Sequence, residues 1–290
     1  MSVVPIAAVQ TDVRFADVRH NFQRTLDQLR TAQTGGAKLV IFPECVLSGY
    51  TFESRAAAME IAVSQTDPMF DELAEHCRTL EVYVTLGYLE RDGERLFNAS
   101  SVVGPDGIVG HYRKIHLPNL GVDQFVDRGD IPYRGHRVRG GGFSSIDPPP
   151  SVGLAICYDC SFPEPMRVLG LEQVDIVALG TNWPVAAART AEVVPPARSM
   201  ENHYYFVAAN RIGHENGFDF CGRSSICGPD GAVLAACDDD SEIILHAEVD
   251  LQIARTKRIE RTAGKHSIDR FADRRPEFYG PIGKQGGSAG

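Results

Sequence analysis

Three residues with reactive side chains each stand at the end of a short apolar run that is typical of a buried strand. They are Glu44 after residues 39–43, Lys114 at the end of 108–114, and Cys157 after 152–156. The carboxyl ends of strands are where α/β folds bind their ligands. We therefore expect these three side chains to meet at one site.

A thiol, a carboxylate and an ammonium that converge can carry out acyl transfer. Cysteine attacks as its thiolate, and a carboxylate whose pKa is raised by burial can take the thiol proton and return it to a departing amine. Glu44 suits that acid–base role. The ammonium of Lys114 would stabilise the thiolate and a developing oxyanion, and the backbone N–H of Tyr158 is a natural second oxyanion donor. The chemistry needs no metal and no cofactor, and neither is predicted.

Other interpretations of these residues were weighed. A lone cysteine at a strand end is more often a small buried apolar residue. The hypothesis of acyl transfer therefore rests on the three residues together and on none of them alone. The spacing of Cys157 and Cys160 also suggests a redox or zinc motif, but zinc requires a second pair, and Cys221 and Cys227 have the wrong spacing. His116 could pair with a cysteine as in a protease, but a structural hydrogen-bonding role is the more common one for such a residue.

Short apolar runs alternate with amphipathic segments along the chain, which indicates an α/β fold. Strands are expected at 4–10, 38–42, 81–89, 152–156, 175–179 and 205–210, and helices at 16–34, 68–80, 164–173 and 186–200, the last with a break at Pro195-Pro196. The turn Gly-Pro-Asp-Gly occurs at 104–107 and again at 228–231, each time between strand-like runs. This repeat suggests two similar halves, with two sheets sandwiched between helical layers.

The chain reads as one domain over residues 1–280, followed by a mobile tail at 281–290 that ends in Gly-Gly-Ser-Ala-Gly. It has 290 residues and a net charge of -9, which argues against nucleic acid or an anionic membrane as a partner. No secretory signal or membrane span is evident. The seven scattered cysteines form no disulfide framework, so a cytoplasmic location is predicted.

Several segments resemble a known family. Phe42-Pro43-Glu44, the run 112–118 and Cys157-Tyr158-Asp159 are similar to the three signature segments of the nitrilase superfamily, in the expected order. Flanking stretches resemble its carbon–nitrogen hydrolase branch, namely 161–164, 181–184, 198–202, 207–211 and 228–231. The resemblance covers the chain from Ile6 to about Tyr279.

This resemblance implies a four-layer α-β-β-α sandwich with internal pseudo-symmetry, a homodimer or higher homo-oligomer, and hydrolysis through a thioester on Cys157. The expected substrate is a small linear amide or N-carbamoyl compound. Nitrile hydrolysis is an alternative, although many nitrilases carry Trp-Glu where this chain has Tyr158-Asp159. Acyl transfer to an acceptor other than water, or a catalytically idle binding subunit, are further alternatives.

Three more residues are candidates for supporting roles. Many family members carry a further Glu in the loop after the catalytic lysine, and this chain has none there. Asp123 is the nearest carboxylate and either takes that role or caps the loop. Asn182 and Trp183 follow the strand after the nucleophile; they are candidates for the substrate pocket, although Trp183 suits the core equally well.

Overall fold

The computed structural model describes residues 2–284, which divide into two compact units. The first unit extends to Arg255 and the second begins at Thr256. The single domain over 1–280 stays a prediction. Of the tail predicted at 281–290, the residues 285–290 lie outside the described part of the chain.

Two six-stranded mixed sheets form the centre of the first unit. The first sheet has the order β14 (Ile243–Asp250), β1 (Val3–Gln10), β2 (Leu39–Ile41), β3 (Tyr83–Asp92), β4 (Arg95–Gly104) and β5 (Gly107–Arg113). The second has the order β13 (Val233–Ala236), β12 (Ser225–Cys227), β9 (Tyr205–Asn210), β8 (Ile176–Thr181), β7 (Ser151–Ile156) and β6 (Gly135–Arg137). A short hairpin of β10 (His214–Glu215) and β11 (Phe218–Asp219) lies apart from both sheets.

The two sheets repeat one pattern of strand directions. From β14 to β5 the neighbouring pairs are antiparallel, parallel, parallel, antiparallel and antiparallel. From β6 to β13 the sequence of pairings is the same. The two Gly-Pro-Asp-Gly turns join β4 to β5 and β12 to β13, which are equivalent positions in this pattern. The repeated turn therefore marks equivalent hairpins in two similar halves.

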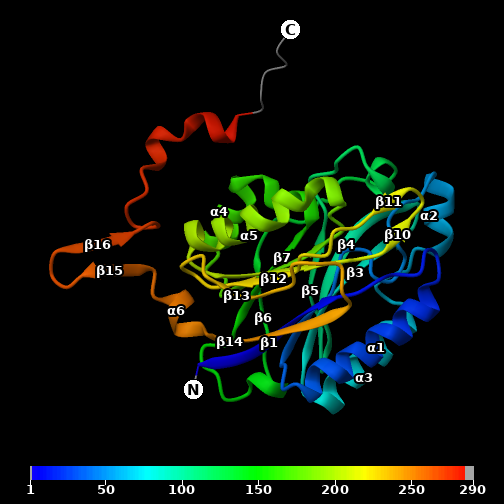
Figure 1. Ribbon diagram of the computed structural model, residues 1–290, viewed down its shortest axis with the longest axis horizontal. Coiled ribbons are helices and arrows are strands. Elements are labelled where there is room, and N and C mark those ends of the chain that lie inside the picture. The colour runs from blue at the N-terminus through cyan, green and yellow to red at the C-terminus, as the bar shows by residue number, and fades with distance from the viewer. Residues whose placement is uncertain (1, 285–290) are drawn as a thin grey trace, which may run out of the picture. The chain divides into compact units, whose positions relative to one another are not determined.

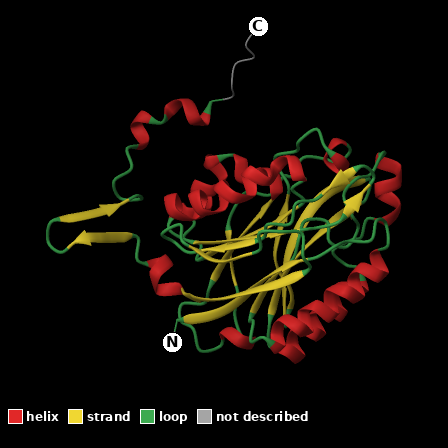
Figure 2. Cartoon of the chain, viewed as in Figure 1, coloured by secondary structure: helices red, strands yellow, loops and turns green. Residues whose placement is uncertain are grey.

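Helices cover the outer faces of the two sheets, giving the four-layer sandwich that the sequence predicted (Figures 1 and 2). The helices of this unit are α1 (Val18–Thr34), α2 (Arg55–Ile61), α3 (Pro68–Leu80), α4 (Pro163–Leu171), α5 (Ala188–Asn202) and α6 (Leu251–Arg255). Helices α1 and α3 pack on the first sheet, and α5 packs on β9 and β12 of the second and also contacts α4. Figure 1 shows these two groups of helices on opposite sides of the paired sheets.

The buried apolar residues form one core between the sheets and another between the first sheet and its helices. The inter-sheet core includes Ile41 from β2 and Leu154 from β7. The outer core includes Val40 from β2 together with Leu26 of α1 and Leu73 of α3. Since neighbouring residues in a strand point to opposite faces, Val40 and Ile41 enter different cores. Strand β2 is thus buried on both faces, which explains why its sequence is a continuous apolar run.

Local signals fix where the helices begin. The side chains of Asp17, Ser54 and Asp67 accept hydrogen bonds from backbone N–H groups in the first turns of α1, α2 and α3. The predicted break at Pro195-Pro196 is wrong, because α5 continues through both prolines. Pro195 is buried, and packing of α5 against β9 and β12 outweighs the backbone hydrogen bonds that the prolines remove.

The second unit contains a hairpin of β15 (Arg258–Thr262) and β16 (His266–Asp269), followed by short 3₁₀ turns at Pro276–Phe278 and Gly280–Gly283. In this unit the side chains of Phe278 and Ile282 are exposed. None of the helices within residues 2–284 has the length and apolar character needed to cross a lipid bilayer.

Candidate active site

Glu44 and Lys114 both follow strands of the first sheet that run in the same direction. Strand β2 is parallel to β3, and β5 returns to that direction after two antiparallel steps through β4. The residues after β2 and β5 therefore lie at the same edge of the sheet. There Nζ of Lys114 lies 2.6 Å from Oε1 of Glu44, and both side chains are fully buried.

Asp123 joins this pair from the short 3₁₀ helix Gly121–Gln124. Its Oδ2 lies 2.5 Å from Nζ of Lys114 and accepts a hydrogen bond of 2.7 Å from the Tyr50 hydroxyl. Asn98 on β4 donates through Nδ2 to Oδ1 of Asp123 at 2.9 Å and to Oε1 of Glu44 at 2.7 Å. Asp123 is therefore part of the buried cluster rather than a cap of its loop.

The two oxygens of Glu44 have different surroundings. Oε1 receives hydrogen bonds from both Lys114 and Asn98. Among the described residues, the buried Oε2 has no hydrogen-bond partner. A buried carboxylate oxygen without a donor is unfavourable unless another molecule supplies one. Oε2 is thus the oxygen of Glu44 that is available for proton exchange.

Cys157 ends the strand β7 and begins the short 3₁₀ helix Cys157–Ser161. Its backbone has a φ of 43°, a left-handed conformation that is rare for residues other than glycine and costs about 1–2 kcal/mol. Such strain is concentrated at functional sites. The side chain is 9% exposed, and the charges of Glu44 and Lys114 both act on it.

The shifted pKa values define the resting charges of the site. Burial raises the pKa of Glu44, the charge of Asp123 adds to this, and Lys114 opposes it. Burial lowers the pKa of Lys114, but the charges of Asp123 and Glu44 outweigh that effect and raise it well above its usual value. Burial raises the pKa of the Cys157 thiol, and Glu44 adds to the rise while Lys114 opposes it. These shifts favour a protonated thiol and a charged lysine, and the raised pKa of Glu44 suits a carboxyl group that exchanges a proton.

The remaining predicted residues lie around Cys157. The backbone of Asn182 acts to lower the pKa of the Cys157 thiol, and the buried carboxamide of Asn182 finds no partner in the part of the chain that the structure describes. Trp183 is 4% exposed and belongs to the inter-sheet core that also contains Cys157. The side chain of Tyr158 is exposed and meets the Phe162 ring edge to face. Asn182 therefore offers unpaired polar atoms to a bound molecule, whereas Trp183 packs in the core.

Two glycines allow the backbone of Glu44 to approach both sheets. A Cβ atom on Gly87 of β3 would lie 2.5 Å from the carbonyl oxygen of Pro43 and 2.8 Å from Cα of Glu44. A Cβ atom on Gly180 of β8 would lie 2.8 Å from the backbone nitrogen of Glu44. Real Cβ atoms do not come so close to backbone, so any larger residue at either position must displace the segment that carries Glu44.

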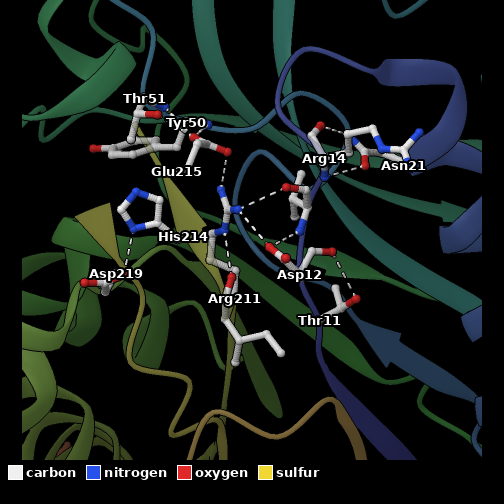
Figure 3. Close-up of polar contacts among 12 residues, drawn as sticks. Thr11, Asp12, Arg14, Asn21, Tyr50, Thr51, Arg211, His214, Glu215 and Asp219 are labelled. Carbon is white, nitrogen blue, oxygen red and sulfur yellow. Dashed lines mark hydrogen bonds and ion pairs between the residues drawn. The ribbon is translucent and has the colours of Figure 1, made fainter. Parts of the chain in front are cut away.

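A buried ion pair holds the loop that follows Glu44 (Figure 3). Oε1 of Glu215 accepts hydrogen bonds from the backbone N–H groups of Tyr50 and Thr51 and from the Thr51 hydroxyl, at 2.7 to 2.8 Å. Its Oε2 lies 2.6 Å from Nη1 of Arg211, whose side chain is completely buried. Through these contacts, the segment after β9 fixes the position of Tyr50 and hence of its bond to Asp123.

Sequence reasoning missed Tyr50 and Asn98. Asn98 is a polar residue on a largely buried strand, and a polar side chain on a buried strand is a usable signal for a site. Tyr50 gave no such signal, because a tyrosine in a loop is common.

Comparison with known proteins agrees with this fold. The family model described as carbon-nitrogen hydrolase matches residues 5–258. A nitrilase from Pyrococcus abyssi is 36% identical over 280 residues, covering 96% of this chain and 99% of that protein. An (R)-stereoselective amidase from a Pseudomonas species is 32% identical, covering 93% of this chain and 91% of that protein. A solved mutant of the Nesterenkonia AN1 amidase from the nitrilase superfamily is 22% identical and has a TM-score of 0.79, covering 96% and 97% of the two chains.

The chain therefore belongs to the carbon–nitrogen hydrolase family of the nitrilase superfamily.

Proposed function

We propose that this protein hydrolyses a non-peptide carbon–nitrogen bond in a small linear amide or N-carbamoyl compound, with Glu44, Lys114 and Cys157 as catalytic residues. The observation that carries the proposal is the buried cluster in which Lys114 contacts both Glu44 and Asp123 while Oε2 of Glu44 is left without a donor. Relatives named as amidases support the amide class of substrate.

The first half of the reaction forms a thioester. Glu44 takes the proton of the Cys157 thiol as Sγ attacks the carbonyl carbon, and the carbonyl oxygen becomes an oxyanion. Lys114 and the backbone N–H of Tyr158 stabilise that oxyanion. The carbon–nitrogen bond then breaks, and Glu44 passes its proton to the departing nitrogen, which leaves as ammonia or an amine.

The second half returns the enzyme to its starting state. Water attacks the thioester carbon while Glu44 takes one of its protons. The carbon–sulfur bond breaks, the acid is released, and the proton on Glu44 returns to the sulfur. Lys114 stays charged throughout, because Asp123 and Glu44 raise its pKa. Asp123 acts as its permanent counter-ion.

A substrate panel tests this proposal. Short amides, ureido acids and nitriles are incubated with the wild type, Cys157→Ala and Cys160→Ala, and ammonia release is measured; nitriles are included because one relative is named a nitrilase. Cys160 is another buried free thiol three residues away and serves as the matched control. We expect turnover to be lost in Cys157→Ala and retained in Cys160→Ala. Wild-type turnover in Cys157→Ala would rule the nucleophile out.

The same assay tests which molecule accepts the acyl group from Cys157. Hydroxylamine added to the reaction intercepts an acyl-enzyme and yields a hydroxamate, whereas water yields the acid. We expect the acid to dominate without added acceptor and mass spectrometry to place a trapped acyl group on Cys157. An adduct on Cys160 would contradict the assignment.

We also propose a homodimer in a reducing compartment such as the cytoplasm. Helices α4 and α5 expose the apolar side chains of Val168, Leu171, Val193 and Met200, each more than 40% exposed, which favours a covered surface. All seven cysteines are free thiols, which suits a reducing environment. Light scattering of the purified protein tests the dimer, and a monomeric mass would contradict it.

A further inference from the structure

A second buried carboxylate, Asp159, lies two residues after Cys157 and takes no part in the chemistry above. It is completely buried and accepts four hydrogen bonds. Its Oδ2 accepts from the backbone N–H of Ile156 and from the Tyr112 hydroxyl, both at 2.9 Å. Its Oδ1 accepts from Nδ1 of His116 at 2.8 Å and from the His116 backbone N–H at 3.3 Å.

These donors lie on both sides of the proposed catalytic residues. Ile156 directly precedes Cys157, at the end of β7 in the second sheet. Tyr112 and His116 lie two residues before and two residues after Lys114, at the end of β5 in the first sheet. One carboxylate therefore links the strand end that carries the thiol to the strand end that carries the ammonium. Among the contacts of Asp159, the one to Ile156 holds the strained turn at Cys157, and the others hold the Lys114 segment.

We propose that Asp159 is a positioning residue that sets the distance between the Cys157 thiol and the Lys114 ammonium. The inference rests on the proposed function, because the separation matters only if these two groups act together. A misplacement of about 1 Å at reacting groups reduces rates by about 100-fold. A carboxylate that fixes both segments directly prevents such a shift.

The chemistry of the four contacts explains why a carboxylate is required. All four partners are donors, and an ionised carboxylate offers only acceptor positions. The amide of asparagine has the same shape but replaces one oxygen with an NH₂ group, which would face donors and repel them. Rotating the amide merely moves this mismatch to the other side. Asp159→Asn therefore releases at least the backbone N–H of Ile156 or that of His116, which can only donate, without creating a cavity.

The surroundings of Asp159 strengthen this link. The Tyr112 hydroxyl also accepts a hydrogen bond from the Ile115 backbone N–H at 3.1 Å, and it lies 2.7 Å from the Tyr133 hydroxyl. The His116 ring stacks on Phe162 at 4.1 Å between centroids. Burial raises the pKa of Tyr112 and the Asp159 charge adds to this rise, so the hydroxyl stays a donor. The network therefore keeps its direction across the pH range in which a hydrolase is assayed.

Asp175 provides a matched control within the same sheet. It is a buried aspartate that accepts from the Ser151 backbone N–H at 2.9 Å, at the opposite end of β7, and from Nε and Nη2 of Arg255 at 2.8 and 2.9 Å. Asp175→Asn likewise removes a buried charge and disturbs β7, but at the end remote from Cys157. A role of Asp159 in folding alone predicts equal effects for the two variants.

The test uses two readouts on the full chain. Steady-state kinetics give kcat and KM on the best amide of the panel, and the rate of Cys157 alkylation by iodoacetamide, read by peptide mass spectrometry between pH 6 and 10, reports the thiol without any substrate. For Asp159→Asn we expect kcat to fall about 100-fold with KM within about twofold. We also expect its alkylation profile to move to higher pH, because Lys114 no longer lowers the thiol pKa as effectively. Asp175→Asn should match the wild type in both readouts.

Equal kinetics and equal alkylation profiles for Asp159→Asn and Asp175→Asn would overturn the proposal. If Asp159→Asn does not fold, Tyr112→Phe removes one of the four donors at little change in volume, and we expect a smaller shift of both readouts in the same direction. Wild-type values for Tyr112→Phe would then overturn the proposal. If the wild type hydrolyses nothing in the panel, the proposed function fails, and the alkylation profiles alone still decide the positioning role.

Discussion

Nζ of Lys114 lies 2.5 Å from Oδ2 of Asp123, and both side chains are completely buried. The same ammonium contacts Glu44, so one positive charge stands between two carboxylates. Asp123 has donors on both oxygens, whereas Glu44 has donors on one only. The proposed mechanism accordingly gives the proton-transfer role to Glu44, whose Oε2 has no donor among the described residues, and not to Asp123.

The first prediction concerns Asp123→Asn and the pH dependence of kcat/KM. The charge of Asp123 raises the pKa of Glu44, so its removal lowers that pKa and moves the acid limb of the profile to lower pH. The same charge helps to hold the pKa of Lys114 above its usual value of 10.5, so an alkaline limb set by Lys114 lies above pH 10 in the wild type and can enter the measured range only in the variant. The measurement is kcat/KM for ammonia release from pH 4 to 10.

Asp127→Asn is the control for this prediction, because Asp127 lies in the same loop but is 39% exposed and paired with Arg55. Its profile should match that of the wild type. An Asp123→Asn profile with unshifted limbs would mean that Asp123 does not set the charge state of the site.

The second prediction tests the close approach around Glu44. Gly180→Ala places a methyl group within 2.8 Å of the Glu44 backbone nitrogen, so Glu44 must shift and kcat should fall by 10-fold or more, roughly as expected for a displaced catalytic group. Gly153→Ala on the neighbouring strand β7 is the control, because the atoms nearest to its methyl group belong to the side chains of Leu169 at 2.9 Å and Val174 at 3.3 Å and not to the Glu44 segment. Equal kcat values for the two variants would show that Glu44 tolerates displacement.

Much of this architecture could be predicted from the sequence. The apolar runs before Glu44 and Cys157 are the strands β2 and β7, and the repeated turn marks equivalent hairpins. The four-layer class of the fold followed from the alternation of strands and helices together with the signature segments. Asp123 emerged as the nearest carboxylate in its loop, although its contacts with Lys114, Asn98 and Tyr50 needed coordinates.

Other features could not be predicted from the sequence, and each has a physical reason. Strand β14 pairs with β1 over a sequence separation of more than 230 residues, and its alternating burial gives a weak apolar signal. The helix α2 is short and buries only Ala58. Pro195 and Pro196 stay helical because tertiary packing overrides a local preference. The role of Asn98 depends on Glu44 and Asp123, which come from two separate segments, and no local pattern encodes such contacts.

The third prediction concerns the buried pair of Glu215 and Arg211 shown in Figure 3. Glu215→Gln leaves the completely buried Arg211 guanidinium with only the partly exposed Asp12 as an anionic neighbour, at 3.2 Å. We expect the free energy of unfolding to fall by about 3 kcal/mol, as for a broken buried ion pair. Urea denaturation followed by circular dichroism measures this change.

Asp27→Asn is the control for the buried pair, since it removes an ion pair with Arg30 in which both side chains are largely exposed. Its effect should stay within about 0.5 kcal/mol. A loss of similar size in both variants would show that the burial of Arg211 adds nothing to the strength of its pair with Glu215.

The last prediction is a pH-dependent stability linked to Glu90, whose carboxylate receives two hydrogen bonds from the Arg113 guanidinium at 2.8 and 2.6 Å. Burial raises the pKa of Glu90, but the bonds from Arg113 and His111 outweigh it and lower the value to about 2. Because the folded-state pKa lies below the usual value near 4.5, the stabilisation is fully present above pH 4.5 and is lost as the pH falls toward 2.

Glu90→Gln removes this contribution and leaves Arg113, the residue before Lys114, with weaker partners. At pH 7 we expect a loss of about 2–3 kcal/mol in the free energy of unfolding, the usual range for hydrogen bonds to a charged group. The difference between variant and wild type should shrink below pH 4.5, because there the unfolded wild type binds a proton on Glu90 while the folded protein does so only near pH 2. Urea denaturation at a series of pH values measures the unfolding free energy of both proteins. A difference between them that stays constant down to pH 2.5 would contradict the lowered pKa of Glu90.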